Sequence, residues 1–115
     1  MDSRDKLKKV VEALNEKKGI NIMAFDVDEK SGYTDYMVFV SGTSIQHNQT
    51  MSDFLQRELK KEGFIRPLIE GAQSSKWILV DAGDIIVNIM LDEIRDYYHL
   101  EDIWSDSPKV DVTSL

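Results

Sequence analysis

The 115-residue chain contains no cysteine, only two histidines and only two prolines. The absence of cysteine excludes disulfides, thiolate zinc sites and cysteine nucleophiles, and it is consistent with a reducing compartment. Two histidines, His47 and His99, argue against a histidine-rich metal site. The apolar runs are too short to span a bilayer, and residues 1–5 lack the apolar segment of a secretory signal. We therefore expect a cytoplasmic protein with no membrane segment and no metal site.

The composition is that of a globular protein, with 42% apolar and 30% charged residues. A chain of this size buries about two thirds of the surface that its unfolded form exposes, which is enough for a core without disulfides or a structural metal. We expect one domain over residues 1–105. Residues 106–115 include Pro108 and show no sustained periodicity, so we expect a flexible tail there.

The net charge of −7 is unevenly distributed along the chain. Residues 70–106 hold two basic residues, Lys76 and Arg95, against nine acidic ones, so this segment alone carries −7. An acidic surface is repelled by nucleic-acid phosphates, which argues against direct DNA binding and favours a basic protein as partner. The alternative is that the acidity only keeps the protein soluble.

Hydrophobic periodicity predicts the order helix, strand, strand, helix, three strands, helix. The first helix spans residues 3–18, the second is capped by Ser44 and ends at Gly63, and the third is capped by Asp92 and reaches His99. Strands are predicted at residues 22–27, 36–40, 65–70, 76–81 and 84–91, whereas the turn-rich segment 28–32 is too short for a helix. The first two strands are antiparallel neighbours, Pro67 favours a sheet edge, and the second helix makes a parallel crossover. The fold class is therefore α/β, with a mixed five-stranded sheet and helices packed on it.

The last two predicted strands flank Ala82-Gly83, which suits a two-residue hairpin turn that pairs Asp81 with Asp84. Because side chains alternate along a strand, one hairpin face is wholly aliphatic and must be core. The other face carries Trp77, Leu79, Ile86, Asn88 and Met90, with the acids Glu70, Asp84 and Glu93 at its ends. Large apolar side chains ringed by charge are typical of a protein-binding patch. The pattern leaves open whether a helix covers this face instead.

Enzyme motifs are weak in this sequence. Gly42-Thr43-Ser44 superficially resembles the start of a nucleotidyltransferase site, but the first acid that follows, Asp53, lies in a predicted helix and has no carboxylate partner two positions on. Asp26 and Asp28 have the required spacing but precede the glycine. Ser44 and His47 on one helical turn suit a cap and a surface residue better than a nucleophile and its base. Anion binding by the loop amides remains open.

Several motifs occur together in a recognisable order: Thr34-Asp35-Tyr36-Met37-Val38, Ser41-Gly42-Thr43-Ser44 with His47, Glu70-Gly71, Trp77, Val80-Asp81, Gly83-Asp84-Ile85-Ile86-Val87, Tyr98, Leu100-Glu101 and Trp104. In this combination the chain resembles the ribosomal silencing factors, also called RsfS or Iojap-like proteins. Two departures are Asn88, where members often have histidine, and a slightly longer loop over residues 28–33.

The resemblance implies a nucleotidyltransferase-like fold without catalytic carboxylates, and no cofactor. It implies binding to large-subunit ribosomal protein fourteen, which blocks joining of the small and large ribosomal subunits and represses translation. It also implies a homodimer in many members, and the hairpin face suits that use equally well. The alternative function is a nucleotide-binding or nucleotidyltransferase-like enzyme.

The resulting hypothesis is a steric repressor rather than an enzyme. Its partner-binding residues are an apolar centre, a polar contact and acids that pair with lysine or arginine: Trp77, Leu79, Ile86 and Met90, then Asn88, then Glu70, Asp84 and Glu93.

Overall fold

The computed structural model describes residues 2–32, 34–64 and 66–115. No helix within these ranges has the length and apolar character needed to cross a membrane. The elements in chain order are α1 (Ser3–Glu16), β1 (Ile20–Asp26), α2 (Asp28–Ser31), β2 (Tyr36–Gly42), α3 (Ile45–Lys61), β3 (Leu68–Glu70), β4 (Trp77–Asp81), β5 (Ile85–Leu91), α4 (Asp92–Tyr98), the 3₁₀ helix η1 (Leu100–Trp104), β6 (Lys109–Val110) and the 3₁₀ helix η2 (Val112–Ser114).

The strands form one mixed sheet in the order β3-β4-β5-β2-β1-β6. β2 and β5 are parallel, and the other neighbouring pairs are antiparallel. The predicted α/β class and mixed sheet are confirmed, but the sheet has six strands rather than five. The two antiparallel pairings between β3 and β5 make β3 run in the same direction as β2, as the predicted crossover requires. β3 is an edge strand that begins after Pro67, and Ile65, its predicted first residue, lies outside the described residues.

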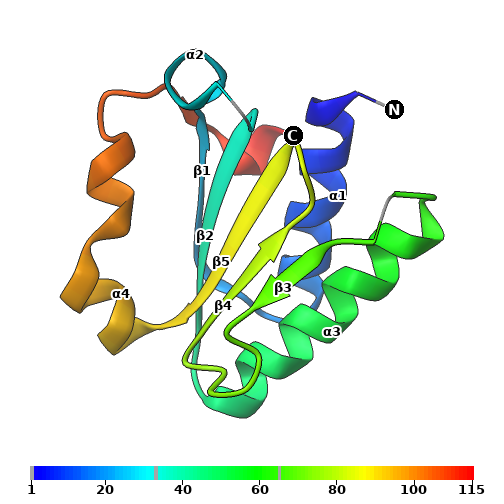
Figure 1. The fold of residues 1–115 in the computed structure, drawn as a ribbon, viewed down its shortest axis with the longest axis vertical. Helices are drawn as coiled ribbons and strands as arrows, with labels where there is room; N and C mark the ends of the chain where they lie inside the picture. The colour runs from blue at the N-terminus through cyan, green and yellow to red at the C-terminus, as the bar shows by residue number, and fades with distance from the viewer. Residues whose placement is uncertain (1, 33, 65) are drawn as a thin grey trace.

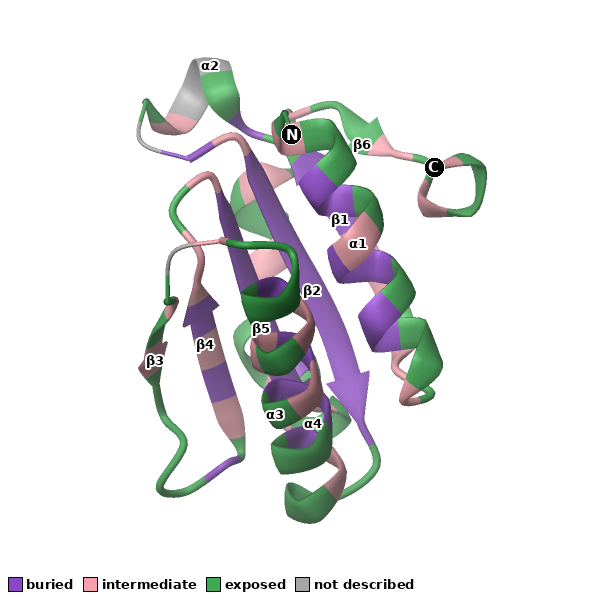
Figure 2. Cartoon of the chain, turned by 90° about the vertical axis from the view of Figure 1, so that its right-hand side faces the viewer, coloured by how far each residue is buried: buried purple, intermediate pink, exposed green. Residues whose placement is uncertain are grey.

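Helices cover both faces of the sheet. Figure 1 shows α1 and α3 on one side and α4 on the other. The main core lies between the sheet and the apolar stripes of α1 and α3, and Figure 2 shows that the buried residues of both helices gather on the sides that face β2 and β5. Leu7, Val10 and Leu14 of α1 are fully buried, and burying a side chain of this size stabilises the fold by about 1.5–3 kcal/mol.

The helix starts follow the sequence with one exception, whereas the helices end one or two residues earlier than predicted, at Glu16, Lys61 and Tyr98. The Ser44 hydroxyl accepts a hydrogen bond from the His47 amide at 3.0 Å, which confirms the predicted cap of α3. Asp92, in contrast, is not a cap: Leu91 occupies the cap position of α4 without a side-chain bond, and Asp92 is the first helical residue. There its negative charge still favours the positive end of the helix dipole.

The segment after β1 is helical for one turn, which corrects the prediction that it is too short for a helix. α2 is four residues long and ends at Gly32, whose φ of 72° is the left-handed conformation that stops helices. Tyr33, the end of the loop compared above with the resembling family, lies outside the described residues.

The hairpin turn lies one residue later than predicted. The Ala82 amide donates to the Ile85 carbonyl at 2.9 Å, so Gly83 and Asp84 form the turn and Trp77 lies opposite Met90 rather than Asn88. Gly83 supplies the positive φ, 85°, that primed hairpin turns need at their first central position. The new register moves each strand by one residue relative to the turn. The parity of the pairing is therefore unchanged, and both faces keep the residues predicted for them.

The C-terminal residues, expected to form a flexible tail over 106–115, are placed on the sheet. β6 pairs with the open edge of β1, and the side chains of Val110, Val112 and Leu115 pack against the main core. The sheet therefore continues past the boundary predicted at residue 105. Beyond β6, hydrogen bonds from the Thr113 side chain and amide, and from Ser114, lower the pKa of the Asp111 carboxyl.

Candidate functional site

The second face of the hairpin is partly covered. α4 and η1 pack over it, and Ile94, Leu100 and Trp104 contact a second buried cluster. This cluster contains Phe25, Val27, Met37, Phe39, Ile86 and Met90. The sequence left open whether this face binds a protein or is covered by a helix. In the structure α4 and η1 cover it over the central strands, whereas part of β4 and β3 stays accessible.

Three predicted contact residues lie under this cover. Met90 is fully buried, and Ile86 and Asn88 are 7% and 4% exposed. They belong to β5, a central strand, and their side chains are enclosed between the sheet and the elements that follow it. In this structure they support the surface from below and cannot form its contact layer.

Asn88 has a different part from the one predicted. Its Oδ1 accepts a hydrogen bond from Nε1 of Trp77 at 3.0 Å, and its Nδ2 lies 3.4 Å from the Val38 carbonyl and 3.3 Å from the Met37 sulfur. The amide is therefore used entirely inside the protein. It orients the half-buried indole, whose outer side remains accessible.

Exposed and half-buried residues form an apolar patch around Trp77. The Tyr98 ring centroid lies 5.6 Å from that of Trp77, and the Tyr97 ring lies 5.0 Å from Tyr98. Leu79 follows on the same face of β4, and the register places Leu68 of β3 on this face too. We call this surface the apolar patch; its members are Leu68, Trp77, Leu79, Tyr97, Tyr98 and Ile103.

Four of these residues are not among those predicted from the sequence for this surface. Leu68, Tyr97, Tyr98 and Ile103 are 71%, 78%, 54% and 57% exposed. Exposed leucine on a short edge strand and two adjacent tyrosines on a short helix were the available signals, because one narrow helix face cannot bury both rings.

A small groove lies beside the patch. Leu79, Ile86 and Asn88 line it from the sheet, and Leu100, Ile103 and Trp104 line it from η1. Its volume of about 170 Å³ is below the roughly 300–1,000 Å³ of typical small-molecule sites. The groove fits a side chain of a protein partner better than a nucleotide.

The predicted acids divide into two groups. Glu70 is exposed and pairs in register with Leu79, so it lies at the border of the patch; Glu93 is exposed in the first turn of α4. Asp84 is different, because its Oδ1 lies 2.6 Å from Nζ of the buried Lys6. It sits in the hairpin turn, at the opposite end of β5 from Glu93. Its side chain is 38% exposed, and its part as a partner contact stays a prediction.

A buried ion pair fastens α4 and η1 to the sheet. Arg95 Nε donates to Glu101 Oε1 at 3.2 Å, and Arg95 Nη1 donates to the Ser41 hydroxyl at 3.0 Å. The side chains of Arg95 and Glu101 are only 7% and 19% exposed. One guanidinium thus joins β2, α4 and η1, and it holds the two elements that carry Tyr97, Tyr98 and Ile103.

The polar groups of the loop before α3 form hydrogen bonds within the protein. The Thr43 amide donates to Nδ1 of His47 at 2.9 Å, and Nε2 of His47 lies 2.7 Å from the Lys17 carbonyl. Both ring nitrogens of His47 are therefore engaged with the backbone of this chain. Ser44 is occupied as the helix cap, and within the described ranges no cluster of three or more acids and histidines could hold a metal ion.

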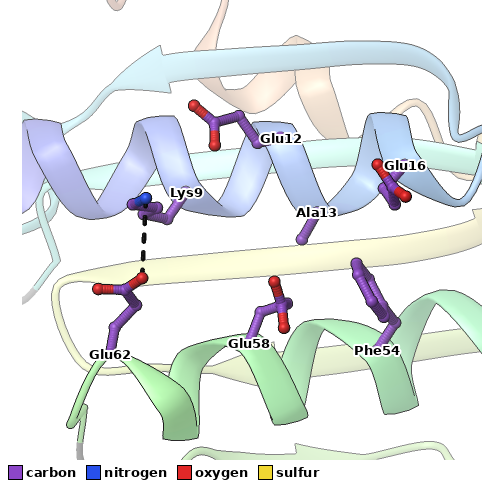
Figure 3. A pocket seen from close by; sticks show the side chains of 7 residues that line it. All are labelled: Lys9, Glu12, Ala13, Glu16, Phe54, Glu58 and Glu62. Atoms are coloured by element: carbon purple, nitrogen blue, oxygen red, sulfur yellow. Dashed lines mark ion pairs between the residues drawn. The ribbon is translucent and has the colours of Figure 1, made fainter.

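A second concavity lies between α1 and α3, on the opposite face of the sheet. Figure 3 shows its carboxylates and the ion pair across it, in which Nζ of Lys9 lies 3.7 Å from Glu62 Oε1. Its lining is Lys9, Glu12, Ala13, Glu16, Phe54, Glu58 and Glu62. Lys61 also pairs with Glu58, at 2.9 Å. These acids are a second source of negative charge, outside the segment that the charge analysis singled out, and we assign them no ligand.

Comparison with known proteins connects this architecture to a family. The family model "Ribosomal silencing factor during starvation" matches residues 1–115. The chain is 42% identical over 96 residues to a ribosomal silencing factor RsfS of Haemophilus influenzae, covering 84% of this chain and 94% of that protein. A mouse protein named "Mitochondrial assembly of ribosomal large subunit protein 1" is 32% identical over 84% of this chain, which matches 43% of its own length. A crystal structure from Chromobacterium violaceum superposes with a TM-score of 0.87 at 33% identity, over 90% of this chain and 87% of that one. The resemblance found in the motifs is confirmed, and the chain belongs to the ribosomal silencing factor family, RsfS.

Proposed function

We propose that the chain is a cytoplasmic repressor of translation that binds the large ribosomal subunit through the apolar patch and sterically prevents the small subunit from joining. The observation that carries this proposal is the accessible Trp77–Tyr98–Tyr97 ring cluster, set on a rigid sheet. A few large aromatic side chains at the centre of a surface dominate the affinity of many protein interfaces. Membership in a family named for ribosomal silencing supplies the target.

The partner we propose is large-subunit ribosomal protein fourteen, the partner that the family resemblance implies. Ribosomal proteins are basic, and the patch is bordered by exposed acids such as Glu70 and Glu93. Charges at the border of an interface mainly accelerate association and select the partner, whereas the apolar centre slows dissociation. The mechanism needs no chemical step.

The shape of the protein supports a steric mechanism. The Cα atoms extend over 32 × 32 × 25 Å, and α1 and α3 lie on the side of the sheet away from the patch (Figure 1). A protein of this thickness, bound to the large subunit by the apolar patch, would keep the small subunit from approaching to contact distance. A standard interface needs roughly 800 Å² on each partner, which is feasible for a domain of this size.

The direct test is the variant Trp77→Ala, measured by co-sedimentation with isolated large subunits and with small subunits as a specificity control. We expect an affinity loss of about thirtyfold, because removal of a central interface aromatic costs about 2 kcal/mol or more. Ile45→Ala is the matched control, since Ile45 is also partly exposed but begins α3 on the other face. Circular dichroism establishes that both variants are folded. Undiminished binding of folded Trp77→Ala contradicts the proposed site.

A second copy of the chain competes for the same surface in this proposal, because an apolar patch can also form a homodimer. Sedimentation velocity of the unmodified chain and of Trp77→Ala separates the two uses. If the patch forms the dimer, Trp77→Ala becomes monomeric at concentrations where the unmodified chain dimerises. Loss of subunit binding without a change in oligomeric state assigns the patch to the ribosome.

A further inference from the structure

A basic groove lies at the β3 edge of the molecule, between α3 and the segment that enters β3. Its volume is about 490 Å³ and its lining is Gln56, Arg57, Lys60, Phe64, Arg66 and Pro67. Three of these residues are cationic and none is acidic, although the chain has 21 acidic and 14 basic residues. The groove is therefore opposite in charge to the protein as a whole.

The cations of the groove are uncompensated. Within the described ranges, Arg57, Lys60 and Arg66 form no ion pair, whereas the neighbouring Lys61 pairs with Glu58 at 2.9 Å. All three are exposed, and the Arg57 guanidinium lies 6.0 Å from the centroid of the Phe54 ring. Their charges are available to an anionic partner.

Phe64 adds an aromatic wall to this groove. Nζ of Lys6 lies 4.6 Å from the centroid of its ring, which helps to hold the ring in place, and Phe64 remains partly exposed among the three cations. Cationic side chains that contact phosphates, placed beside a ring on which a base can stack, are typical of surfaces that bind RNA.

The net charge of −7 does not prevent such binding locally. Charges are screened over about 8 Å at physiological ionic strength, and the most acidic segment, residues 70–106, contributes no residue to the lining of the groove. The total charge therefore disfavours nucleic-acid binding by the surface as a whole, but not at this groove, whose described lining residues are basic, neutral or aromatic.

The groove and the apolar patch adjoin at the same edge strand. Pro67 lines the groove, and the next residue, Leu68, is the outermost member of the patch. A partner surface that meets the patch and extends past β3 would therefore meet the groove. We propose that the groove binds the phosphate backbone of ribosomal RNA next to the protein contact, an inference that rests on the proposed ribosomal target.

The test is a salt titration with isolated large subunits. The variant Arg57→Gln/Lys60→Gln/Arg66→Gln removes the groove cations, and the control Arg4→Gln/Lys8→Gln/Lys18→Gln removes three exposed cations around α1, so both proteins have the same net charge. Affinity is measured from 50 to 200 mM KCl. The logarithm of the binding constant falls as log salt rises, and each lost phosphate contact makes this fall less steep by about 0.7–0.9. We therefore expect the slope of the groove variant to be smaller in magnitude by about 2, and its affinity at low salt to be at least tenfold weaker.

The outcomes separate the two proposals. If the unmodified chain binds and the groove variant matches the control in affinity and slope, the groove inference is wrong and the proposed function stands. If the unmodified chain does not bind large subunits, the proposed function is wrong and this inference with it. A photo-crosslinking residue, p-benzoylphenylalanine, at Gln56 identifies the occupant. An adduct removed by ribonuclease supports RNA, and an adduct with a ribosomal protein overturns the assignment to RNA.

Discussion

Trp77 and Asn88 form a donor–acceptor pair across two antiparallel strands, with 3.0 Å between the indole Nε1 and the amide Oδ1. Asn88 is buried and also contacts the Val38 carbonyl on the parallel neighbour strand. The pair links the centre of the sheet to the aromatic ring at its surface. Asn88 is therefore a positioning residue for the proposed interface.

Asn88→Leu should disturb that position. The substitution leaves the indole N–H without its acceptor, and an unsatisfied buried donor costs about 1–3 kcal/mol. We expect this loss in urea unfolding, together with faster exchange of the indole proton in NMR spectra and weaker binding to large subunits. Asn88→His is the control, because an imidazole nitrogen can accept the same bond. Equal indole exchange in the Leu and His variants would contradict the positioning role.

The Arg95–Glu101 pair predicts a larger effect on stability. Glu101→Leu leaves the buried guanidinium without its carboxylate, and removal of one partner of a buried pair costs about 3–5 kcal/mol. We expect the lower end of this range, because the Glu101 side chain retains 19% exposure. Hydrogen exchange should show the loss concentrated in residues 92–104.

The double variant Arg95→Met/Glu101→Leu is the matched comparison for this pair. It removes both charges and restores apolar volume, so we expect it to unfold at a higher urea concentration than Glu101→Leu alone. If the stability losses of Arg95→Met alone and Glu101→Leu alone sum to the loss of the double variant, the ion pair does not fasten α4 and η1.

Local patterns predicted the helices and strands well. The spacing of Leu7, Val10 and Leu14 predicted the buried stripe of α1, and the serine before α3 predicted its cap. The division of the hairpin into two faces was also right, although the turn was placed one residue early. A shift of this kind changes every cross-strand partner but leaves the parity, and therefore the faces, intact.

Contacts between distant segments explain what the sequence did not predict. The pairing of β6 with β1 joins segments more than 80 residues apart, and the bond between Lys6 and Asp84 spans 78 residues. The burial of Met90 depends on where α4 and η1 settle on the sheet, which no periodicity within β5 encodes. Residue type predicted which side chains share this face of the hairpin, but only packing decides which of them reach the solvent.

Gly42→Ala should destabilise the start of α3. A Cβ added at Gly42 would overlap the amide oxygen of Asn48 and come within 3.0 Å of the Met51 methyl carbon. Asn48 is fully buried and its Nδ2 donates to the Ser75 carbonyl at 2.8 Å, so it cannot move without breaking that bond. Overpacking together with a lost buried hydrogen bond costs about 2 kcal/mol or more in urea unfolding.

Gly63→Ala is the control for this substitution. Among the described residues other than its two chain neighbours, no atom lies within 4 Å of a Cβ at Gly63, so we expect only its positive φ of 80° to oppose alanine, at a cost of roughly 1–2 kcal/mol. Adding Asn48→Ala to Gly42→Ala should cost less than the sum of the two single changes, because the clash partner is gone. Strict additivity would show that the contact between Gly42 and Asn48 does not constrain the loop.

The acids of the hairpin region should separate by function. Asp84→Asn removes the charge that faces the buried ammonium of Lys6, 2.6 Å away, so we expect lower stability and unchanged affinity for large subunits. The double variant Glu70→Gln/Glu93→Gln should do the reverse, because both acids are exposed. We expect its stability to change by less than about 0.5 kcal/mol. Its association should be several-fold slower than that of the unmodified chain at low salt, and the two rates should be equal at high salt, where the charges are screened. Stopped-flow binding and urea unfolding on the same proteins measure both quantities. Slower association of Asp84→Asn, with normal stability, would place Asp84 at the interface, with the hairpin turn rather than the β3 edge at its border.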